Sequence, residues 1–455
     1  METNKPSSAL PRREFIKKTV TAAATVAAAP MLRSSLYGQN QAPSTNVTGA
    51  NNRIAVAVVG VGFGIGQNHL IGIHDKCNEN NTVVAAASDV FNKRRNFAKE
   101  KAGLKDSDVY VDYRKLLERK DIDAVLVATH DPMHAQITID AVNSGKHVYC
   151  EKPMTRYLGE AFKVYDAVKA SGKVFQVGSQ GCSAGGWAKC ADLVKDGKLG
   201  ALVWAQSYYC RNSVGGEWNY LIEEETKPEN IDWERWLGPV KKQPFSAEDF
   251  HRWRKYYRYC AGPLGDLVPH KLHPLMLASG NPEFPVRVSA IGTRNVHSDR
   301  NTPGTPEREV PEHFQFLAEF PSGYLITITA STVNAKSPGV AIYTHKATLN
   351  VGSSGERVEL VPEKDFAEEI DPQSFLGLQE EDIRVHEKNW FDCIRSGQQP
   401  NANIELAFRV QTVIALAEMS DRLKTTCLFD EKTRKVTDGA GKEITPITYG
   451  ALADS

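Results

Sequence analysis

A glycine-rich turn interrupts the first strongly apolar stretch of the chain. The stretch that starts at Arg53 reads as a strand and breaks at Gly60, after which Gly62, Phe63, Gly64 and Ile65 lead into a helical pattern. Glycines let backbone N–H groups approach a pyrophosphate, and the positive end of the following helix favours the same anion. The turn predicts a dinucleotide-binding loop, with an ordinary strand-to-helix turn as the alternative. A strict G-x-G-x-x-G motif needs a small residue at position 65, so we expect one extra residue in the loop.

An acidic residue follows the second apolar run. Residues 82–88 read as a strand and end on Asp89, where an acid reaches the adenosine ribose hydroxyls. Lys93, Arg94 and Arg95 come next and could meet the 2′-phosphate of NADP, but an acid at position 89 disfavours that group. We therefore expect NAD, with NADP as the alternative, and interpret the three bases as a solvated helix face.

Three further motifs follow in order. Residues 128–135 read Ala-Thr-His-Asp-Pro-Met-His-Ala, residues 145–148 read Gly-Lys-His-Val, and residues 151–153 read Glu-Lys-Pro. In this order and spacing the motifs resemble those of the glucose-fructose oxidoreductase / inositol dehydrogenase (Gfo/Idh/MocA) family of NAD(P)-dependent enzymes. The resemblance extends from about position 53 to about position 425. It implies an α/β fold in which a Rossmann dinucleotide-binding domain is joined to an α+β domain with a largely antiparallel sheet.

Lys152 lies at the carboxyl end of a predicted buried parallel strand, where such sheets bind ligands. Its ammonium can hydrogen-bond a ribose hydroxyl and a substrate oxygen, and so help to position hydride transfer. The alternative is a surface ion pair with Glu151. His134 begins a helix, so it has the alternative of capping or packing. The cofactor side of the crevice is expected to include Thr129, His130, His134, Glu151, Lys152 and Gln180.

A second cluster lies further along the chain. In the family that this chain resembles, an Asp four residues before a His opens a helix at the active site, and here these are Asp266 and His270. One helical turn separates them, so the carboxylate would orient and charge the imidazole, and His270 would be the general base that takes the hydroxyl proton. His273 shares that face as a substrate contact or as a packed core residue. The three residues are also spaced as metal ligands, but with no further ligand nearby we expect no metal. Pro274 should kink or end this helix.

Residues 212–263 have no sustained periodicity and are crowded with aromatic rings. A long irregular stretch inside a compact enzyme is usually functional, and rings suit the apolar faces of sugars. Most of these rings should belong to the core or to a subunit interface. Trp253, Arg254 and Tyr256 are the residues that we expect in a substrate pocket.

The 455 residues suggest two domains. We assign residues 1–40 to a signal and linker, 50–180 to the nucleotide domain, 181–400 to a substrate and oligomerisation domain, and 401–430 to a helix that packs back on the nucleotide domain. Strand-like runs separated by turns after position 286 predict the antiparallel sheet. One face of this sheet would cover the site, and the other would form a homo-oligomer.

The amino terminus predicts export. Arg12 and Arg13 precede a mild apolar run, which resembles a twin-arginine signal, whereas a frayed amphipathic helix is the alternative. The run is too short for a permanent membrane span. Because this route carries folded proteins, the nucleotide should travel inside the chain to the periplasm or another extracytoplasmic space. Acidic and basic residues balance at 55 each, which excludes an electrostatic footprint for nucleic acid. Eight cysteines without a C-x-x-C pair are expected to be buried thiols.

These features together predict an exported oxidoreductase that transfers hydride between a tightly bound NAD(P) and a sugar, glycoside or polyol. One alternative is an NAD-dependent glycosidase that oxidises a sugar carbon transiently and eliminates the glycosidic substituent, a branch that the resembled family contains. An alternative of another class is a non-catalytic sugar-binding protein.

Overall fold

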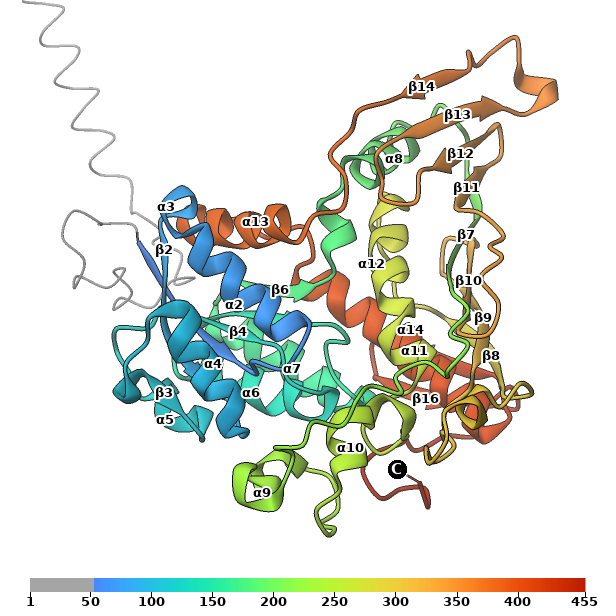
Figure 1. The fold of residues 1–455 in the computed structure, drawn as a ribbon. Helices are drawn as coiled ribbons and strands as arrows, with labels where there is room; N and C mark the ends of the chain where they lie inside the picture. The colour runs from blue at the N-terminus through green and yellow to red at the C-terminus, as the bar shows by residue number, and fades with distance from the viewer. Residues whose placement is uncertain (1–52, 455) are drawn as a thin grey trace, which may run out of the picture.

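The computed structural model describes residues 53–454 and contains two sheets with helices between them (Figure 1). The proposed export signal therefore lies outside the described residues. The first sheet and its helices form a nucleotide domain, and the second sheet stands beside it as a tall wall. Every helix within residues 53–454 is too short or too polar to span a lipid bilayer.

The nucleotide domain is a six-stranded parallel sheet in the order β3-β2-β1-β4-β5-β6. The apolar runs predicted as its strands are almost fully buried, as expected for a parallel sheet covered on both faces. The order reverses between β1 and β4, and ligands bind beyond the carboxyl ends of strands at such a point. Its strands are β1 (Ile54–Val59), β2 (Thr82–Ser88), β3 (Val109–Tyr110), β4 (Ala124–Val127), β5 (His147–Glu151) and β6 (Phe175–Gly178). Its helices are α2 (Ile65–Asp75), α3 (Cys77–Asn80), α4 (Asn92–Ala102), α5 (Tyr113–Leu117), α6 (Asp131–Asn143) and α7 (Leu158–Ser171).

The second sheet has ten strands in the order β14-β13-β12-β11-β7-β10-β9-β8-β15-β16. All neighbours pair antiparallel except β7 and β10, which run parallel. This confirms the predicted fold class. The strands are β7 (Leu202–Cys210), β8 (Arg287–Thr293), β9 (His313–Glu319), β10 (Leu325–Ser331), β11 (Ala341–Thr344), β12 (Ala347–Val351), β13 (Val358–Pro362), β14 (Gln373–Phe375), β15 (Cys427–Asp430) and β16 (Lys435–Thr437).

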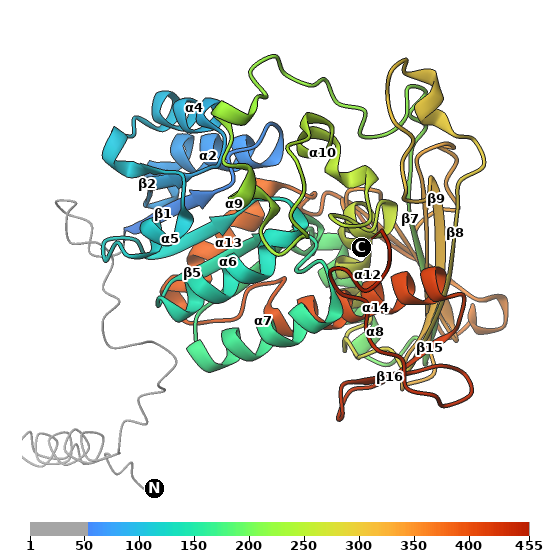
Figure 2. The same ribbon diagram turned by 90° about the horizontal axis from the view of Figure 1, so that it is seen from below.

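Helices cover only one face of this second sheet. In Figures 1 and 2, α8, α12 and α14 lie on the face that looks toward the nucleotide domain, and the opposite face is bare. Pro274 was expected to kink or end its helix; it lies inside α12, which continues to Ala278, so the helix does not end there. The remaining helices are α8 (Gly185–Lys195), α9 (Trp233–Leu237), α10 (Ala247–Arg252), α11 (Pro263–Asp266), α12 (Val268–Ala278), α13 (Ile383–Ser396) and α14 (Ile404–Leu423).

The last two helices connect the domains. Trp390 and Phe391 of α13 are fully buried in one core cluster with residues of β1, although α13 falls in the range assigned to the second domain. Helix α14 contacts α7 and β6 on one side and β8 and α12 on the other. A buried bidentate ion pair fixes it there, because Arg156 Nη1 and Nη2 lie 2.6 and 2.7 Å from the two carboxylate oxygens of Glu418.

Residues 212–239 leave the second sheet after β7 and cross to the nucleotide domain; we call them the strap. Figure 2 shows this segment running from the β7 side toward α4, with α9 lying over the first domain. Ile231 of the strap forms an isolated antiparallel bridge with Phe91, and the Asp232 N–H donates to the Val90 carbonyl at 3.1 Å. The irregular aromatic stretch therefore joins the two domains. All eight cysteines are free thiols, and the prediction of burial is confirmed for six of them, while Cys77 and Cys210 are half-buried.

Candidate active site

The glycine loop between β1 and α2 has the geometry of a phosphate cradle. Gly60 has φ +89°, and a Cβ there would lie 2.6 Å from the Ala128 carbonyl oxygen. Nothing lies within 4 Å of a Cβ built on Gly62, so the space above it is open. A Cβ on Gly66 would lie 2.4 Å from the Gly60 carbonyl oxygen, so Gly66 is the glycine that lets α2 pack against the strand. The loop thus carries the extra residue that its spacing predicts.

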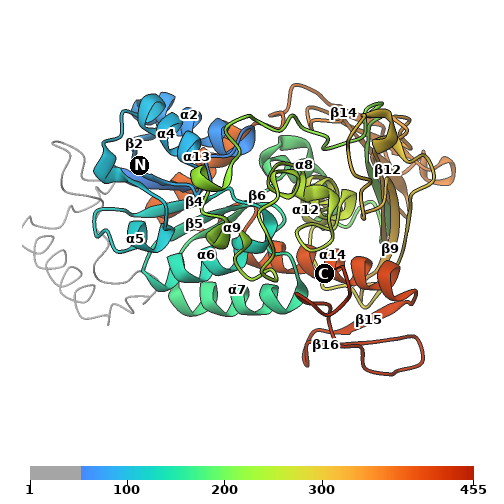
Figure 3. The same cartoon turned by 60° about the horizontal axis from the view of Figure 1, so that its bottom comes forward.

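A cavity of about 1030 Å³ opens beside this loop. Its wall comes from the carboxyl ends of β1, β2 and β4 and, on the opposite side, from the strap and the segment around α10. Figure 3 shows α9 lying across this end of the nucleotide domain. Ten of the residues predicted from the sequence line the cavity: Gly60, Gly62, Phe63, Gly64, Ile65, Asp89, Thr129, His130, Trp253 and Arg254.

Asp89 lies on the cavity wall and is held by backbone amides. Its Oδ2 accepts from the Val61 N–H at 2.7 Å, and its Oδ1 accepts from the Phe91 N–H at 2.8 Å. Burial raises the pKa of this carboxyl group, and the two amides act in the opposite direction. The carboxylate therefore links the glycine loop to the end of β2, which is the position from which it can accept from a ribose hydroxyl.

Lys93, Arg94 and Arg95 were predicted to form a solvated helix face, and this prediction is wrong for Arg94. This side chain is buried, lines the cavity and is ion-paired with Glu223 of the strap. Lys93 Nζ lies 2.8 Å from the other oxygen of Glu223, and Arg95 donates to the Asp89 carbonyl at 2.8 Å. The strap that supplies Glu223 showed no periodicity that would place it here.

Lys152 and Asp266 form the centre of the candidate site. Lys152 Nζ at the end of β5 donates to Asp266 Oδ1 at 2.8 Å and to the Asp266 carbonyl at 2.9 Å. Burial alone would lower the pKa of the ammonium, but the Asp266 carboxylate outweighs it and raises that pKa. Lys152 is therefore a charged hydrogen-bond donor and no surface partner of Glu151.

Asp266 has further partners, and His270 is not one of them. Its Oδ1 accepts from Arg254 Nε at 2.9 Å, and its Oδ2 accepts from Trp218 Nε1 at 3.2 Å. Within residues 53–454, no hydrogen bond or ion pair joins Asp266 to His270. The expected pairing fails because Pro269 lacks an N–H group, so the helical ladder is interrupted between α11 and α12.

His270 stands in the first turn of α12, with its ring centroid 5.8 Å from that of Tyr209. Burial lowers the pKa of its imidazole to about 3, and the nearby charge of Lys152 acts in the same direction, while the carboxylates of Asp266 and Glu151 oppose both. The ring is therefore unprotonated at neutral pH, which a proton acceptor requires, while the lowered pKa makes it a weak base.

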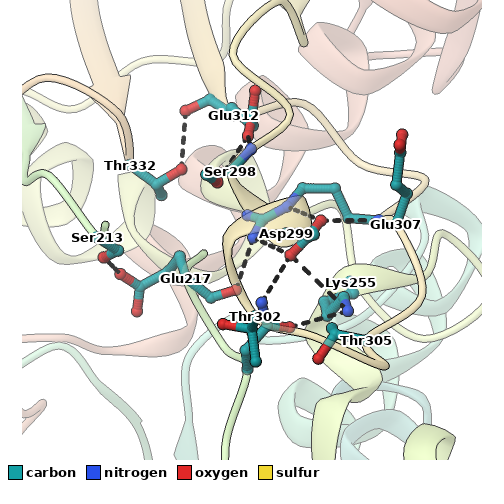
Figure 4. Close-up of polar contacts among 12 residues, drawn as sticks. Ser213, Glu217, Lys255, Ser298, Asp299, Thr302, Thr305, Glu307, Glu312 and Thr332 are labelled. Atoms are coloured by element: carbon teal, nitrogen blue, oxygen red, sulfur yellow. Dashed lines mark hydrogen bonds and ion pairs between the residues drawn. The ribbon is translucent and has the colours of Figure 1, made fainter. Parts of the chain in front are cut away.

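Trp218 was not predicted from the sequence. Its indole is 2% exposed, and its backbone has φ +66°, a region that bulky residues rarely adopt. Behind it lies a buried ion cluster in which Arg308 donates to Asp299 Oδ1 at 2.7 Å and to the Glu217 carbonyl at 2.8 Å. In Figure 4, Lys255 lies beside Asp299, 3.8 Å from Nζ to Oδ1. This cluster fixes the loop that holds Trp218 against Asp266.

Glu151 and Gln180 face each other and do not line the cavity. Gln180 Nε2 donates to Glu151 Oε1 at 3.0 Å, and His69 Nε2 lies 2.9 Å from the same oxygen. His69 Nδ1 lies 2.6 Å from Glu387 Oε1 on α13. Burial alone would lower the pKa of His69, but hydrogen bonds to the two glutamates raise it to about 9. Glu151 and Gln180 thus support the strand end beneath Lys152, and their contact with the cofactor stays a prediction.

Three other predicted site residues also turn inward. His134 bridges the Pro153 carbonyl at 2.7 Å and the Thr129 carbonyl at 3.1 Å, so it packs two loops together. Tyr256 is 7% exposed and donates its hydroxyl to Glu248 at 3.0 Å. His273 is 1% exposed, and its Nδ1 lies 2.8 Å from the Pro269 carbonyl. The roles predicted for these three in contacting cofactor or substrate are therefore not supported. Within the described part of the chain, no three His, Cys, Asp or Glu residues gather as metal ligands.

The residues present fit a dinucleotide. The loop offers a glycine whose side chain would collide with β4, open space above the next glycine, a helix amino terminus and a ribose-side carboxylate at the topological switch point. A charged lysine stands at the end of the neighbouring strand. These features define a two-domain protein of the dinucleotide-binding class.

Comparison with known proteins gives the family. Residues 54–179 match the model described as "Oxidoreductase family, NAD-binding Rossmann fold" (GFO_IDH_MocA), and residues 189–303 match that described as "Oxidoreductase family, C-terminal alpha/beta domain" (GFO_IDH_MocA_C2). Together the two matches span more than half of the chain. The chain belongs to the Gfo/Idh/MocA oxidoreductase family.

Curated relatives match part of the chain. Inositol 2-dehydrogenase of Klebsiella pneumoniae subsp. pneumoniae is 29% identical over 190 residues, which are 40% of this chain and 54% of that protein. Inositol 2-dehydrogenase of Burkholderia ambifaria is 28% identical over 186 residues, with the same two shares. The chain thus spans about half the length of the curated relatives it matches.

Solved structures share the fold over most of the chain. An oxidoreductase domain protein from Kribbella flavida is 21% identical with a TM-score of 0.66, over 84% of this chain and 100% of that one. Levoglucosan dehydrogenase in complex with NADH is 17% identical with a TM-score of 0.65, over 82% and 98%. Aldose-aldose oxidoreductase from Caulobacter crescentus is 19% identical with a TM-score of 0.60, over 83% and 100%.

Proposed function

We propose that this chain is an NAD-dependent oxidoreductase that moves hydride between a bound nicotinamide nucleotide and the CH–OH group of a sugar, glycoside or polyol. The observation that carries the proposal is the Lys152–Asp266–Arg254 cluster. It joins the end of β5 to the wall of the cavity, because Arg254 both lines the cavity and bonds Asp266. The relatives support the substrate class, since their names specify inositol and levoglucosan.

The chain's own residues would divide the chemistry as follows. The glycine loop and Asp89 would hold the nucleotide, whose nicotinamide ring supplies a hydride acceptor. An ammonium has three donors and Asp266 takes two from Lys152, so one remains for the substrate oxygen. That donor would stabilise the negative charge that grows on the oxygen. The neutral imidazole of His270 would take the hydroxyl proton.

The direct test combines binding and turnover. The purified full chain should bind NADH, seen as a change in nicotinamide fluorescence, and should reduce NAD when offered a panel of sugars and polyols. A chain that binds nucleotide but changes its absorbance with none of these compounds would favour the non-catalytic alternative. A chain that binds neither NADH nor NAD would overturn the proposal.

Product masses separate the glycosidase alternative from simple redox chemistry. Oxidation of a glycoside lowers its mass by two hydrogens, whereas transient oxidation followed by elimination releases the glycosidic substituent and leaves the nucleotide in its starting state. Mass spectrometry after incubation with a glycoside panel distinguishes the two. We favour redox chemistry, because Lys152 and the neutral imidazole of His270 suffice for it.

We also propose that the protein is exported by the twin-arginine route to the periplasm or another extracytoplasmic space. The support is the Arg12-Arg13 pair before an apolar run. The R12K/R13K double variant should accumulate as precursor inside the cell, as seen by fractionation and immunoblotting. Normal export of the double variant would rule out this route.

A further inference from the structure

The position that meets a 2′-phosphate in NADP-binding Rossmann domains lies just after β2. Here that position is filled by a closed ion-pair network. Arg94, in the first turn of α4, is 7% exposed, and it lines the nucleotide cavity. Its guanidinium is paired with Glu223, which lines the same cavity from the strap.

The neighbouring cation is engaged in the same way. Lys93 Nζ lies 2.8 Å from Glu223 Oε2 and 2.9 Å from Glu225 Oε1. Glu223 is the shared partner of both bases, and 20% of its side chain is exposed, compared with 53% for Glu225. The two bases that could receive a phosphate are therefore neutralised by an acid that belongs to the other domain.

A phosphate on the ribose would meet two obstacles here. It carries up to two negative charges, and it would lie near the carboxylates of Asp89 and Glu223, which both line the cavity. To gain Arg94 it would have to displace Glu223, which would also break an ion pair between the strap and α4. A ribose 2′-hydroxyl needs neither change, because Asp89 can accept from it directly.

We propose that Glu223 is a specificity-determining residue, which restricts the site to a nicotinamide nucleotide without a 2′-phosphate by holding Arg94 and Lys93. The inference rests on the proposed function and adds a residue from the second domain to cofactor selection. The packing of the strap on α4 becomes part of cofactor selection, because the same ion pairs join the strap to α4 and occupy Arg94 and Lys93.

Direct binding tests this inference without turnover. NADH and NADPH are titrated into the full chain freed of bound nucleotide, and the two Kd values are read from nicotinamide fluorescence. In Glu223→Gln, binding of NADPH relative to NADH should tighten about 10- to 100-fold, the range of a charge-assisted hydrogen bond. Glu225→Gln is the matched control, because it contacts Lys93 alone and does not line the cavity. Its Kd ratio should equal that of the wild type.

A second pair of variants keeps the test decisive if Glu223→Gln folds poorly by circular dichroism. Glu223→Gln/Arg94→Gln should lose the gain in NADPH binding. Arg94→Gln alone should not tighten the binding of NADPH relative to NADH, because Glu223 keeps its negative charge. An unchanged ratio in Glu223→Gln, or tighter NADPH binding in Arg94→Gln alone, would overturn the role of Glu223. Failure of the wild type to bind NADH would overturn the proposed function instead.

Discussion

His270 opens α12 close enough to Lys152 for the charge of that ammonium to act on its pKa, and its ring is neutral. His270→Ala should lower kcat by about 10²- to 10⁴-fold, the usual cost of losing a general base. Nucleotide content should not change, because α12 contributes no residue to the nucleotide cavity. Steady-state kinetics measure kcat, and release of nucleotide by acid measures the nucleotide content. His345→Ala, at an exposed turn of the second sheet, is the control, and full activity in His270→Ala would assign the base elsewhere.

Asp266 keeps two buried cations in place. In Asp266→Asn, burial and the charge of Arg254 would be opposed only by the more weakly acting Glu151, so the pKa of the Lys152 ammonium should fall below its wild-type value. The alkaline limb of the pH profile of kcat/KM should therefore move to lower pH. Asp266→Glu keeps the negative charge, so its alkaline limb should lie close to that of the wild type. An alkaline limb that stays in place in Asp266→Asn would show that Lys152 is not the group titrating there.

The sequence predicted residue types better than residue partners. Lys152, Asp266 and His270 were found because motifs mark them, and the structure brings Lys152 and Asp266 together. The partnership of Asp266 and His270 was inferred from a continuous helical turn, and Pro269 interrupts that turn. Trp218 and Glu223 carried no local signal, because their roles depend on a chain crossing between domains.

Helix α2, strand β5 and helix α13 meet at one buried histidine. His69 lies between Glu151 and Glu387, and its pKa of about 9 exceeds the ordinary value of about 6.5. Because the pKa of His69 is raised in the folded state, its protonated ring stabilises the fold. This contribution is fully present below pH 6.5 and is lost as the pH rises through about 9. The loss should amount to about 3 kcal/mol.

Guanidinium unfolding at pH 6.5 and pH 9 measures this contribution. The free energy of unfolding of the wild type should fall between the two values, and His69→Gln should be less stable at pH 6.5 and should lack most of that fall. His74→Gln, on the exposed face of the same helix, is the control. Equal pH dependence in His69→Gln and the wild type would contradict the assignment.

Periodic elements were predicted well because burial leaves a repeat in the sequence. The helix predicted within residues 401–430 is α14, and the strand-like runs predicted after position 286 correspond to strands of the second sheet from β8 onward. The strap could not be predicted in this way. Its interactions are long-range ion pairs and ring contacts, such as the stack of Trp236 on His130 at 4.3 Å, and these leave no period.

The bare face of the second sheet is where we propose that two copies of the chain associate. Ile291 of β8 and Leu317 of β9 are 70% and 47% exposed there, while Trp204 and Tyr343 stack at 3.8 Å further along. Leu317→Lys should shift the protein toward monomer, because a charge would be buried between the copies. Sedimentation velocity measures this. Val214→Lys, exposed in the strap, is the control, and a wild type that is monomeric would refute the proposal.

The rings of Trp390 and Phe391 close the core around β1, although more than three hundred residues separate them from that strand. A ribosome that has released only the first half of the chain has therefore not yet supplied the side chains that the nucleotide domain needs. Translation must pass α13 before this domain can be completed and loaded with its nucleotide. The amino terminus, which carries the proposed export signal, emerges from the ribosome long before that. The signal would therefore be accessible well before the nucleotide domain is complete.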